Sequence, residues 1–396
     1  MSNNLLTISM ITNEALMVLE NELVFSDAVT REYDDQFAVT GAKIGATLNV
    51  RRPARFIGTT GPALNVEDFN ETSVPVTLST QFHVDTQFTT QDLALSLDMF
   101  SDRVLKPAVA AVANNIDYDG LSMAKLATAN IVGTAGTPPT GLITYLTAGA
   151  YLDAEGAPRD GRRSCIVEPF TSATIVDSLK GLFVPQEAIG EQYRKGLMGR
   201  DSAGMNWKMD QNVVSQTFGS FAGTAVCSTT AATGFLTSGW ASSSTISITS
   251  TGAVSLNAGD VITIDGVYAV NPQNRQAYGS NKLRNFVVKA AASGTGATFN
   301  VTVSPAVITA GQFQNVTIPS TSSTATVNFF NKTGTVSPQN IIMHRNAFTL
   351  AVADLELPEG VHFAGRASDK EIGLSMRVVR QYTINVANDE SFALVA

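Results

Sequence analysis

Alternating apolar and polar positions predict a strand along one early segment of the chain. Val74, Val76 and Leu78, followed by Phe82 and Val84, alternate with polar residues, the period of a half-buried strand. The preceding segment also has an extended character, and Gly58, Gly61 and Pro62 suit a loop tip. The two arms together predict a hairpin of about 40 residues. Since a ribbon of this kind has little core of its own, we expect it to pack on another molecule.

A helical spacing of three or four residues follows directly. Thr89 and Thr90 precede acidic Asp92, a helix-start signal. One apolar face is then formed by Leu93, Leu97, Phe100, Val104, Ala108 and Val112. The pattern predicts a long helix from 89 to about 129, kinked at Pro107 and broken at Gly120.

Shorter patterns predict a mixed α/β body around this helix. Helices are expected at 13–19, 142–155, 172–182, 186–195 and 346–355. Strands are expected at 163–167, 206–214, 341–343 and 372–386.

The middle of the chain has a different composition. Only seven of the 120 residues from Phe221 to Asn340 are charged, and Ser, Thr, Gly and Val dominate. Strands are expected at 243–250, 285–290, 297–303 and 324–330, with a hairpin that joins 261–264 to 267–270. Asp265-Gly266 is the dipeptide favoured in type I′ turns. The segment therefore predicts a small barrel or sandwich inserted into the body.

Charge and cysteine content restrict the class of protein. The 396-residue chain has a formal net charge of −8 and no basic block, which argues against a strong grip on nucleic acid. No run of 18 apolar residues predicts a membrane span, and no signal peptide is visible at the N-terminus. Cys165 and Cys227 are expected to be buried free thiols.

Reactive side chains do not form a catalytic or metal-binding pattern. His83, His344 and His362 lie in different segments without metal-ligand spacing, and no cofactor motif is present. Asp117 and Asp119 could in principle bind a cation but are interpreted as solvated turn residues, and Asp117 alternatively as a cap or ion-pair partner near a helix end. The two tryptophans, at 207 and 240, are interpreted as packing residues.

A cluster of three arginines remains, formed by Arg51, Arg52 and Arg55. It is open to three interpretations. It could contact an acidic surface of another copy, lie on a solvated face, or bind DNA.

The order of these elements resembles that of the major capsid proteins of tailed phages, which have the Hong Kong 97-type fold. The resemblance is closest to coat proteins of short-tailed phages (podoviruses) that carry an extra β-barrel domain. It is carried by Val109–Asp117 in the long helix, Leu256–Val267 in the insert and His344–Leu355 after it. The C-terminal tail, 388–392, departs from the family because it lacks the expected closing aromatic strand.

The resemblance implies an α+β, Hong Kong 97-like capsid fold with an inserted β-barrel-like domain. Its parts would be an N-terminal arm (1–42), an extended loop (43–88), and a spine helix with peripheral domain (89–160). A first axial segment (161–220), the insert (221–337) and a second axial and peripheral segment (338–396) would follow.

The implied function is mechanical and not enzymatic. Copies of the chain would assemble as hexamers and pentamers into an icosahedral shell that encloses DNA without sequence-specific binding. A scaffolding protein, a portal and a decoration protein are expected partners; no cofactor, metal or membrane is expected. Assembly would take place in the host cytoplasm and the product would be the virion. The expected inter-subunit contacts are Arg51, Arg52, Arg55, Phe56 and Phe69.

Two other classes remain open at the level of sequence. A tail, fibre or surface-layer protein would use the β module for adhesion. A hydrolase with an immunoglobulin-like accessory domain would need a nucleophile, a base and an acid together in the body.

Overall fold

The computed structural model describes residues 23–31, 47–63, 66–67, 71–89, 106–178, 202–227, 234–279, 281–318, 324–331, 333–353, 357–361, 363–368, 375–383 and 389–395. The chain forms two compact units. The first contains 1–50, 73–120 and 345–396, and the second contains 51–72 and 121–344. The predicted helices at 13–19 and 186–195, and the predicted long helix before 106, lie outside the described residues.

The first unit contains a four-stranded antiparallel sheet in the order β19-β20-β21-β3. Its strands are β3 (His83–Thr89), β19 (Phe363–Ser368), β20 (Ser375–Thr383) and β21 (Asp389–Val395). The C-terminal tail thus forms a closing strand, contrary to the sequence-based expectation. Phe392 pairs with Arg380 on one side and Thr86 on the other. Backbone pairing on both edges stabilises this strand without an aromatic pattern.

The predicted return arm of the hairpin is two strands. Its first part, β2 (Ser73–Thr77), pairs with β1 (Thr47–Arg51), whereas β3 pairs with β21. Residues 78–82 between them belong to no strand. The prediction of extended structure in this arm is confirmed, but its two halves pair with different strands.

Helix α4 runs without interruption from Lys106 to Ala127, which corresponds to a length of about 33 Å. The predicted break at Gly120 is therefore wrong. A Cβ atom at Gly120 would lie 2.5 Å from Cε1 of Phe25, so the glycine makes room for the phenyl ring. The predicted inner positions Ala108 and Val112 are buried.

Asp117 fixes the segment before Arg31 to this helix. Its Oδ2 accepts hydrogen bonds from the backbone N–H groups of Val24 (2.7 Å) and Phe25 (3.2 Å). Its Oδ1 accepts from the N–H (3.1 Å) and hydroxyl (2.8 Å) of Ser26. The carboxylate thus satisfies the free donors at the start of the short 3-10 helix η1 (Ser26–Ala28). Asp117 is buried, so its interpretation as a solvated turn residue is wrong.

The predicted helix at 346–355 is also wrong over its described part. Only the 3-10 turn η5 (Arg345–Ala347) forms, and Thr349 then makes a parallel bridge with Thr30. The N–H of Thr30 donates to Phe348 O, and the N–H of Leu350 donates to Thr30 O. Pairing with a distant segment satisfies the backbone groups that a helix would have paired locally.

The second unit contains a small α/β body. In its three-stranded sheet, β4 (Arg163–Val167) lies between antiparallel β18 (Ile341–His344) and parallel β5 (Asn206–Met209). Helices α5 (Leu142–Ala154) and α6 (Pro169–Ser178) belong to the same body. A core forms around Tyr145 and Trp207, whose ring centroids lie 4.9 Å apart. The predictions of α5 and β4 are confirmed, and α6 begins three residues earlier than expected.

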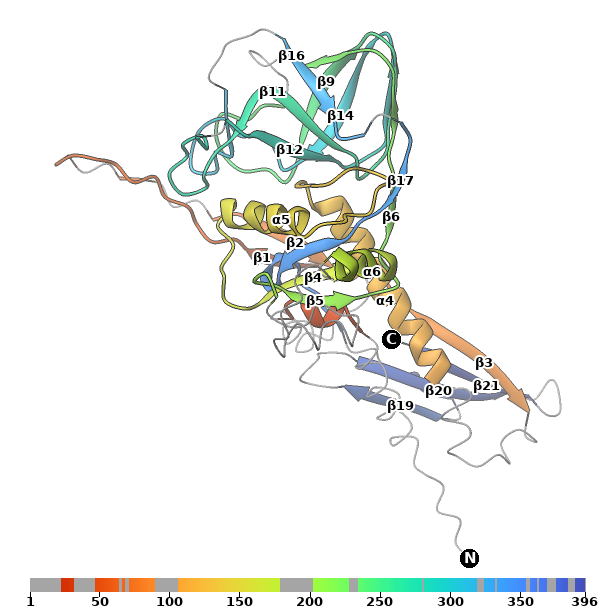
Figure 1. The fold of residues 1–396 in the computed structure, drawn as a ribbon. Coiled ribbons are helices and arrows are strands. Elements are labelled where there is room, and N and C mark those ends of the chain that lie inside the picture. The colour runs from red at the N-terminus through yellow and green to blue at the C-terminus, as the bar shows by residue number, and fades with distance from the viewer. Residues whose placement is uncertain are drawn as a thin grey trace, which may run out of the picture. The chain divides into compact units, whose positions relative to one another are not determined.

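A closed six-stranded β-barrel occupies the middle of the chain (Figure 1). The ring order is β12-β14-β9-β8-β16-β11, and pairing of β11 with β12 closes it. The ring strands are β8 (Ala225–Cys227), β9 (Ser244–Ser250), β11 (Val261–Ala269), β12 (Leu283–Val288), β14 (Thr298–Ser304) and β16 (Ala325–Phe329). Strand β15 (Val316–Thr317) adds to β11, and a separate sheet contains β7 (Ser220–Phe221), β10 (Ala253–Leu256) and β13 (Ala292–Thr295).

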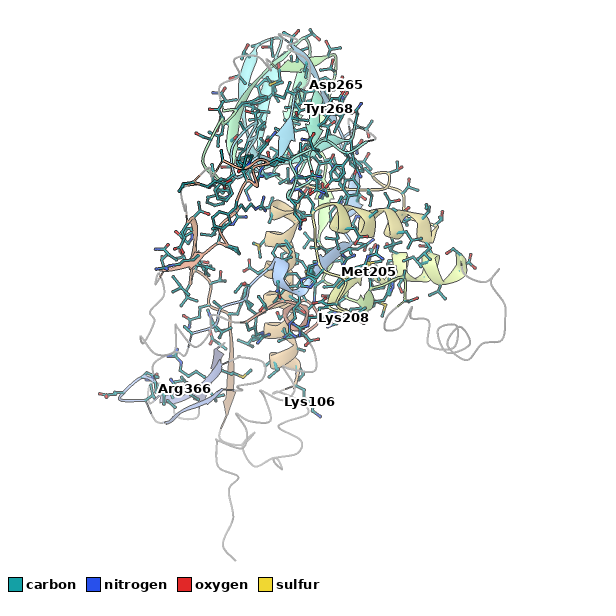
Figure 2. The ribbon with its side chains drawn as sticks, turned by 90° about the vertical axis from the view of Figure 1, so that its left-hand side faces the viewer. Lys106, Met205, Lys208, Asp265, Tyr268 and Arg366 are labelled. Atoms are coloured by element: carbon teal, nitrogen blue, oxygen red, sulfur yellow. The ribbon has the colours of Figure 1, made fainter. Side chains whose placement is uncertain are left out.

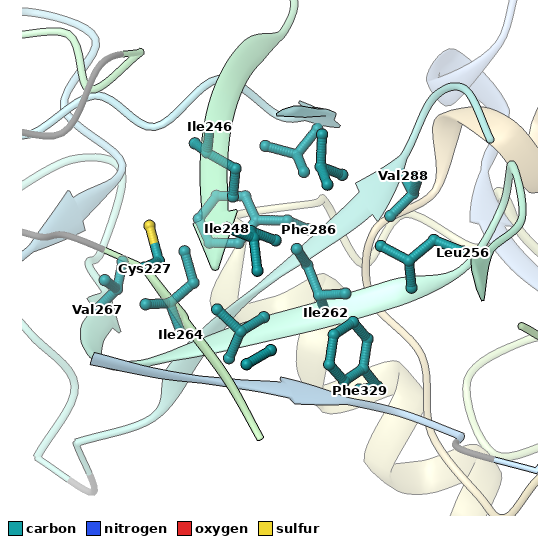
Figure 3. Packing of buried hydrophobic residues seen from close by; sticks show 14 of the residues in the cluster. Cys227, Ile246, Ile248, Leu256, Ile262, Ile264, Val267, Phe286, Val288 and Phe329 are labelled. Atoms are coloured by element: carbon teal, nitrogen blue, oxygen red, sulfur yellow. The ribbon is translucent and has the colours of Figure 1, made fainter. Parts of the chain in front are cut away.

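Strict alternation of inward and outward residues produces the barrel core. Along β9, Ile246 and Ile248 are fully buried, and they pack with Ile262, Ile264 and Phe286 from facing strands (Figure 3). Since each of these side chains buries apolar area, the core contributes on the order of 2 kcal/mol per side chain.

Hydroxyl groups cover the outer face of the same strands. Ser247 donates to Asn300 at 2.8 Å, and the hydroxyls of Thr249 and Thr298 lie 2.8 Å apart. These cross-strand pairs make the surface polar without charge. They give the barrel a polar outer face although the insert has few charged residues.

The Asp265-Gly266 dipeptide is a bulge and not a hairpin turn. Strand β11 continues through it, and its register against β12 shifts between Thr263 and Tyr268. Figure 2 labels Asp265 and Tyr268 on this strand. Gly266 has φ +76°, a conformation that a type I′ turn and a glycine bulge both require. Barrel closure selects the bulge because the strand must bend to meet several partners.

Two short strands connect the barrel to the body. Strand β6 (Ser215–Thr217) pairs antiparallel with β17 (Val336–Pro338), so the incoming and outgoing segments lie side by side. Buried Asp260 stabilises this stem, since it accepts from Gln216 Nε2 and from the N–H of Gly219, both at 3.0 Å. Burial raises the pKa of Asp260.

Candidate assembly surface

The β1–β2 ribbon consists of the strands β1 and β2 and the segment 52–72 between them. Its strand residues are exposed or half-buried, and none is buried. At its far end, the side chains of Val66 and Phe56 are 91% and 59% exposed. Apolar side chains in such positions are typical of a surface that another molecule covers.

Arg51 and Arg52 face different surroundings although they are neighbours in sequence. Arg51 forms an exposed ion pair with Glu71, with N and O 3.4 Å apart. The guanidinium of Arg52 lies over the ring of Trp240, 4.5 Å from its centroid. Burial, followed by repulsion from Arg55, lowers the pKa of Arg52. Trp240 therefore does more than pack, because it supports a cation.

The backbone at Phe56 is also held by the insert. Arg275 Nη2 donates to Phe56 O at 2.8 Å and to Gln312 O at 3.3 Å. Across the ribbon, the N–H of Ile57 donates to Glu67 Oε2 at 2.6 Å. At Arg52 and Phe56 the ribbon thus contacts the barrel of its own chain. The expectation that it relies only on another molecule is corrected for this part.

Of the five expected contact residues, the structure places Arg52 and Arg55 beside the barrel. Arg51 lies outside this group, the side chain of Phe56 is exposed, and Phe69 lies outside the described residues. Sequence reasoning missed Arg275. In the sequence, Arg275 is distinguished only as one of seven charged residues in the insert region, which does not indicate a partner.

Four contacts anchor the barrel to the helices of its own unit. Tyr278 donates its hydroxyl to Ala154 O, and Arg284 pairs with Glu155. Lys289 Nζ donates to Leu126 O at 3.1 Å, at the C-terminal turn of α4, where a cation is favourable. The fourth contact places Lys282 Nζ 3.2 Å from the centroid of the Tyr151 ring.

Two of the three histidines each lie beside a single carboxylate. His344 lies 3.1 Å from Asp160 and His83 lies 3.5 Å from Asp85, while His362 is outside the described part. A search of the described residues finds no group of three metal ligands. No helix among them is both long enough and apolar enough to span a membrane.

The thiols are buried and free, as expected. Burial raises the pKa of Cys227 to about 11, and it raises the pKa of Cys165 further. Neither group therefore has appreciable thiolate character at neutral pH.

A family model described as P22 coat protein, gene protein 5, matches residues 1–391. The chain belongs to the P22 coat protein family. Membership confirms the prediction of a phage major capsid protein with a structural role. It does not favour the tail, fibre or surface-layer alternative.

A comparison with solved structures finds several that are similar to this chain. One from Mycobacterium phage Che8 has a TM-score of 0.38 and 14% identity, over 79% of this chain and 92% of that chain. A capsid structure of the cyanophage P-SCSP1u has a TM-score of 0.36 and 12% identity, over 84% and 88%. The mature capsid of bacteriophage PhiM1 has a TM-score of 0.31 and 13% identity, over 64% and 81%. A comparison with curated proteins finds no match.

Proposed function

We propose that this coat protein is the repeating subunit of an icosahedral shell, arranged as hexamers and pentamers around the phage genome. The observation that carries the proposal is the exposed β1–β2 ribbon in a chain of this family. Val66 and Phe56 present apolar surface at its far end, and we assign this surface to a neighbouring copy. Each contact can be weak, because closure of the shell repeats it many times.

The proposed division of the chain follows the Hong Kong 97-like plan. It consists of an N-terminal arm (1–42), an extended loop (43–88), a spine and peripheral region (89–160), a first axial segment (161–220), the insert (221–337) and a second axial and peripheral segment (338–396). The continuous helix α4 supports the spine assignment. The paired stem of β6 and β17 supports an insert that leaves the body and returns at one place.

The net charge of −8 suits a shell that confines DNA without binding to it. A scaffolding protein and a portal are the partners proposed for assembly in the host cytoplasm, and a decoration protein for the finished virion. The anchoring contacts of Tyr278, Arg284 and Lys289 support a stabilising role for the insert within its own subunit.

Electron microscopy of the expressed full-length chain tests the proposal. Uniform closed shells are the expected product, and a chain that stays monomeric in every condition, including co-expression with its scaffolding protein, would contradict the proposal. Deletion of Phe56–Phe69 should abolish assembly while native circular dichroism persists.

A matched pair of substitutions tests the ribbon more finely. Val66→Ser removes an exposed apolar side chain from the ribbon, and Val336→Ser makes the same change on the stem, where Val336 is 57% exposed. We expect both subunits to keep their stability within about 0.5 kcal/mol, but only Val66→Ser to reduce shell yield. Equal yields would show that the ribbon end is not a contact.

A further inference from the structure

A cavity of about 350 Å³ lies between the base of the ribbon and the barrel. Three places in one compact unit contribute to its wall. Arg52 and Arg55 come from the ribbon, Glu155 follows α5, and Trp240 and Arg284 come from the barrel. The cavity therefore brings three guanidinium groups and one carboxylate together.

The charges in this cavity are not balanced by the chain itself. Glu155 is paired with Arg284. Within the described part of the chain, no carboxylate lies within 4.0 Å of the guanidinium of Arg52 or Arg55. Two positive charges thus face a concave surface in an otherwise acidic protein.

The donor groups are held in place before anything binds. The cation–π contact with Trp240, 4.5 Å from the guanidinium carbon to the ring centroid, holds the Arg52 guanidinium at the cavity wall. Arg284 uses Nη1 for Glu155, and its Nε is buried without a hydrogen-bond partner. A planar guanidinium with free edge donors matches a two-oxygen acceptor.

We propose that this cavity is an oxyanion site that receives an Asp or Glu carboxylate from a second copy of the chain. The inference rests on the proposed function, because it assigns a partner group to the base of the same ribbon. Phosphate offers similar oxygens. However, Glu155 lines the cavity and repels a phosphate dianion more than a carboxylate with a single charge. The net charge of −8 also supplies acidic surface on every copy.

A matched pair of variants of the full-length chain tests the site. Arg55→Gln removes a guanidinium from the cavity wall, and Arg162→Gln makes the same change at an exposed position outside the cavity, just before β4. We expect Arg55→Gln to lower DNA-free shell assembly about tenfold or more, the effect of one lost charge-assisted hydrogen bond. Arg162→Gln should assemble at the wild-type rate. Should Arg55→Gln lower the thermal midpoint of the subunit, Arg55→Lys replaces it, because it keeps the charge but loses the planar fork.

A cryo-EM map of wild-type shells supplies the direct observation. An Asp or Glu of a neighbouring subunit within 4 Å of Arg52 or Arg55 supports the proposal. Wild-type assembly by the cavity variant, or a cavity filled only by solvent or phosphate, overturns it. A defect that appears only when DNA is packaged also overturns it, in favour of nucleic-acid phosphate.

The failure of this site and the failure of the proposed function give different results. If the wild-type chain forms no shells, the proposed function fails. Thermal shifts of the subunit then still test the cavity, with sodium acetate compared to sodium chloride at equal ionic strength. Acetate should raise the thermal midpoint of wild type and of Arg162→Gln more than that of Arg55→Gln, and an equal response of all three overturns the proposal.

Discussion

Replacement of Asp117 by alanine removes one carboxylate that accepts four hydrogen bonds. Three come from consecutive backbone N–H groups at Val24, Phe25 and Ser26, and the fourth comes from the hydroxyl of Ser26. Asp117 is 1% exposed and Ser26 is equally buried. Water therefore cannot replace the lost acceptor unless the segment separates from α4.

The expected loss of stability follows from the number of hydrogen-bond donors that Asp117→Ala leaves unsatisfied. A hydrogen bond to a charged group contributes about 1.5–3 kcal/mol, and a buried donor without a partner costs about 1–3 kcal/mol. The four bonds are not additive, because local opening of the segment lets water reach the donors. We therefore expect Asp117→Ala to cost about 3–5 kcal/mol. Asp117→Asn should cost about half as much, since its amide retains one acceptor oxygen.

Hydrogen exchange of the unassembled subunit measures this cost locally. At a tenfold change per 1.4 kcal/mol, the amides of Val24, Phe25 and Ser26 should lose about 100- to 3000-fold protection. Asp119→Ala is the control, because Asp119 is exposed two residues further along the helix. It should change stability by less than about 0.5 kcal/mol. A loss below about 1 kcal/mol in Asp117→Ala, or unchanged exchange at these amides, would refute the reasoning.

Two further predictions concern helix packing and acid sensitivity. Gly120→Ala should destabilise the subunit by about 1–3 kcal/mol in urea unfolding because its Cβ meets Phe25. Gly149→Ala in α5, where the added Cβ would have no heavy atom within 4 Å, should stabilise the subunit by up to about 1 kcal/mol. If both variants changed the free energy of unfolding in the same direction, the packing argument would be contradicted. The hydrogen bond from Arg159, assisted by Arg163, holds the pKa of Asp153 below its usual value. The ionised Asp153 therefore stabilises the folded subunit at pH values above the unfolded pKa of about 3.9, and this stabilisation is lost as the pH falls through the lower folded pKa. The difference in thermal midpoint between wild type and Asp153→Asn should therefore be largest near pH 7 and shrink below about pH 4, and a constant difference would argue against this ion pair.

The elements that sequence reasoning located correctly are those in which one periodic pattern dominates. The strand at 244–250 and its partner at 298–304 alternate without interruption, and so the barrel could be predicted. The buried positions Ala108 and Val112 follow from helical spacing alone. In these segments local preference and burial agree, which is the condition for a reliable prediction.

The errors arose where distant partners decide between conformations of similar local energy. Asp265-Gly266 suits a turn and a bulge equally, and closure of the ring selects the bulge. Gly120 has the sequence signature of a break, but Phe25, 95 positions away, explains it. Likewise, the pairing of Thr349 with Thr30 replaces a helix that the local sequence favours.

The assembly surface was predictable only in part. The exposed ribbon could be inferred from its length and its lack of a core. The stacking of Arg52 on Trp240 and the bond from Arg275 to Phe56 could not be inferred, because a cation–π pair and a backbone contact leave no spacing pattern in the sequence.

Ring closure of the barrel has a consequence for crowding. In a shell, identical subunits are held at very high local concentration, where any unpaired strand edge can join the wrong neighbour and start aggregation. Hydrogen bonding between β11 and β12 removes such edges from the ring. The β1–β2 ribbon, a sheet of only two strands, keeps two outer edges. Unpaired backbone groups that a neighbouring strand could bind therefore lie along the ribbon and not at the closed seam of the ring.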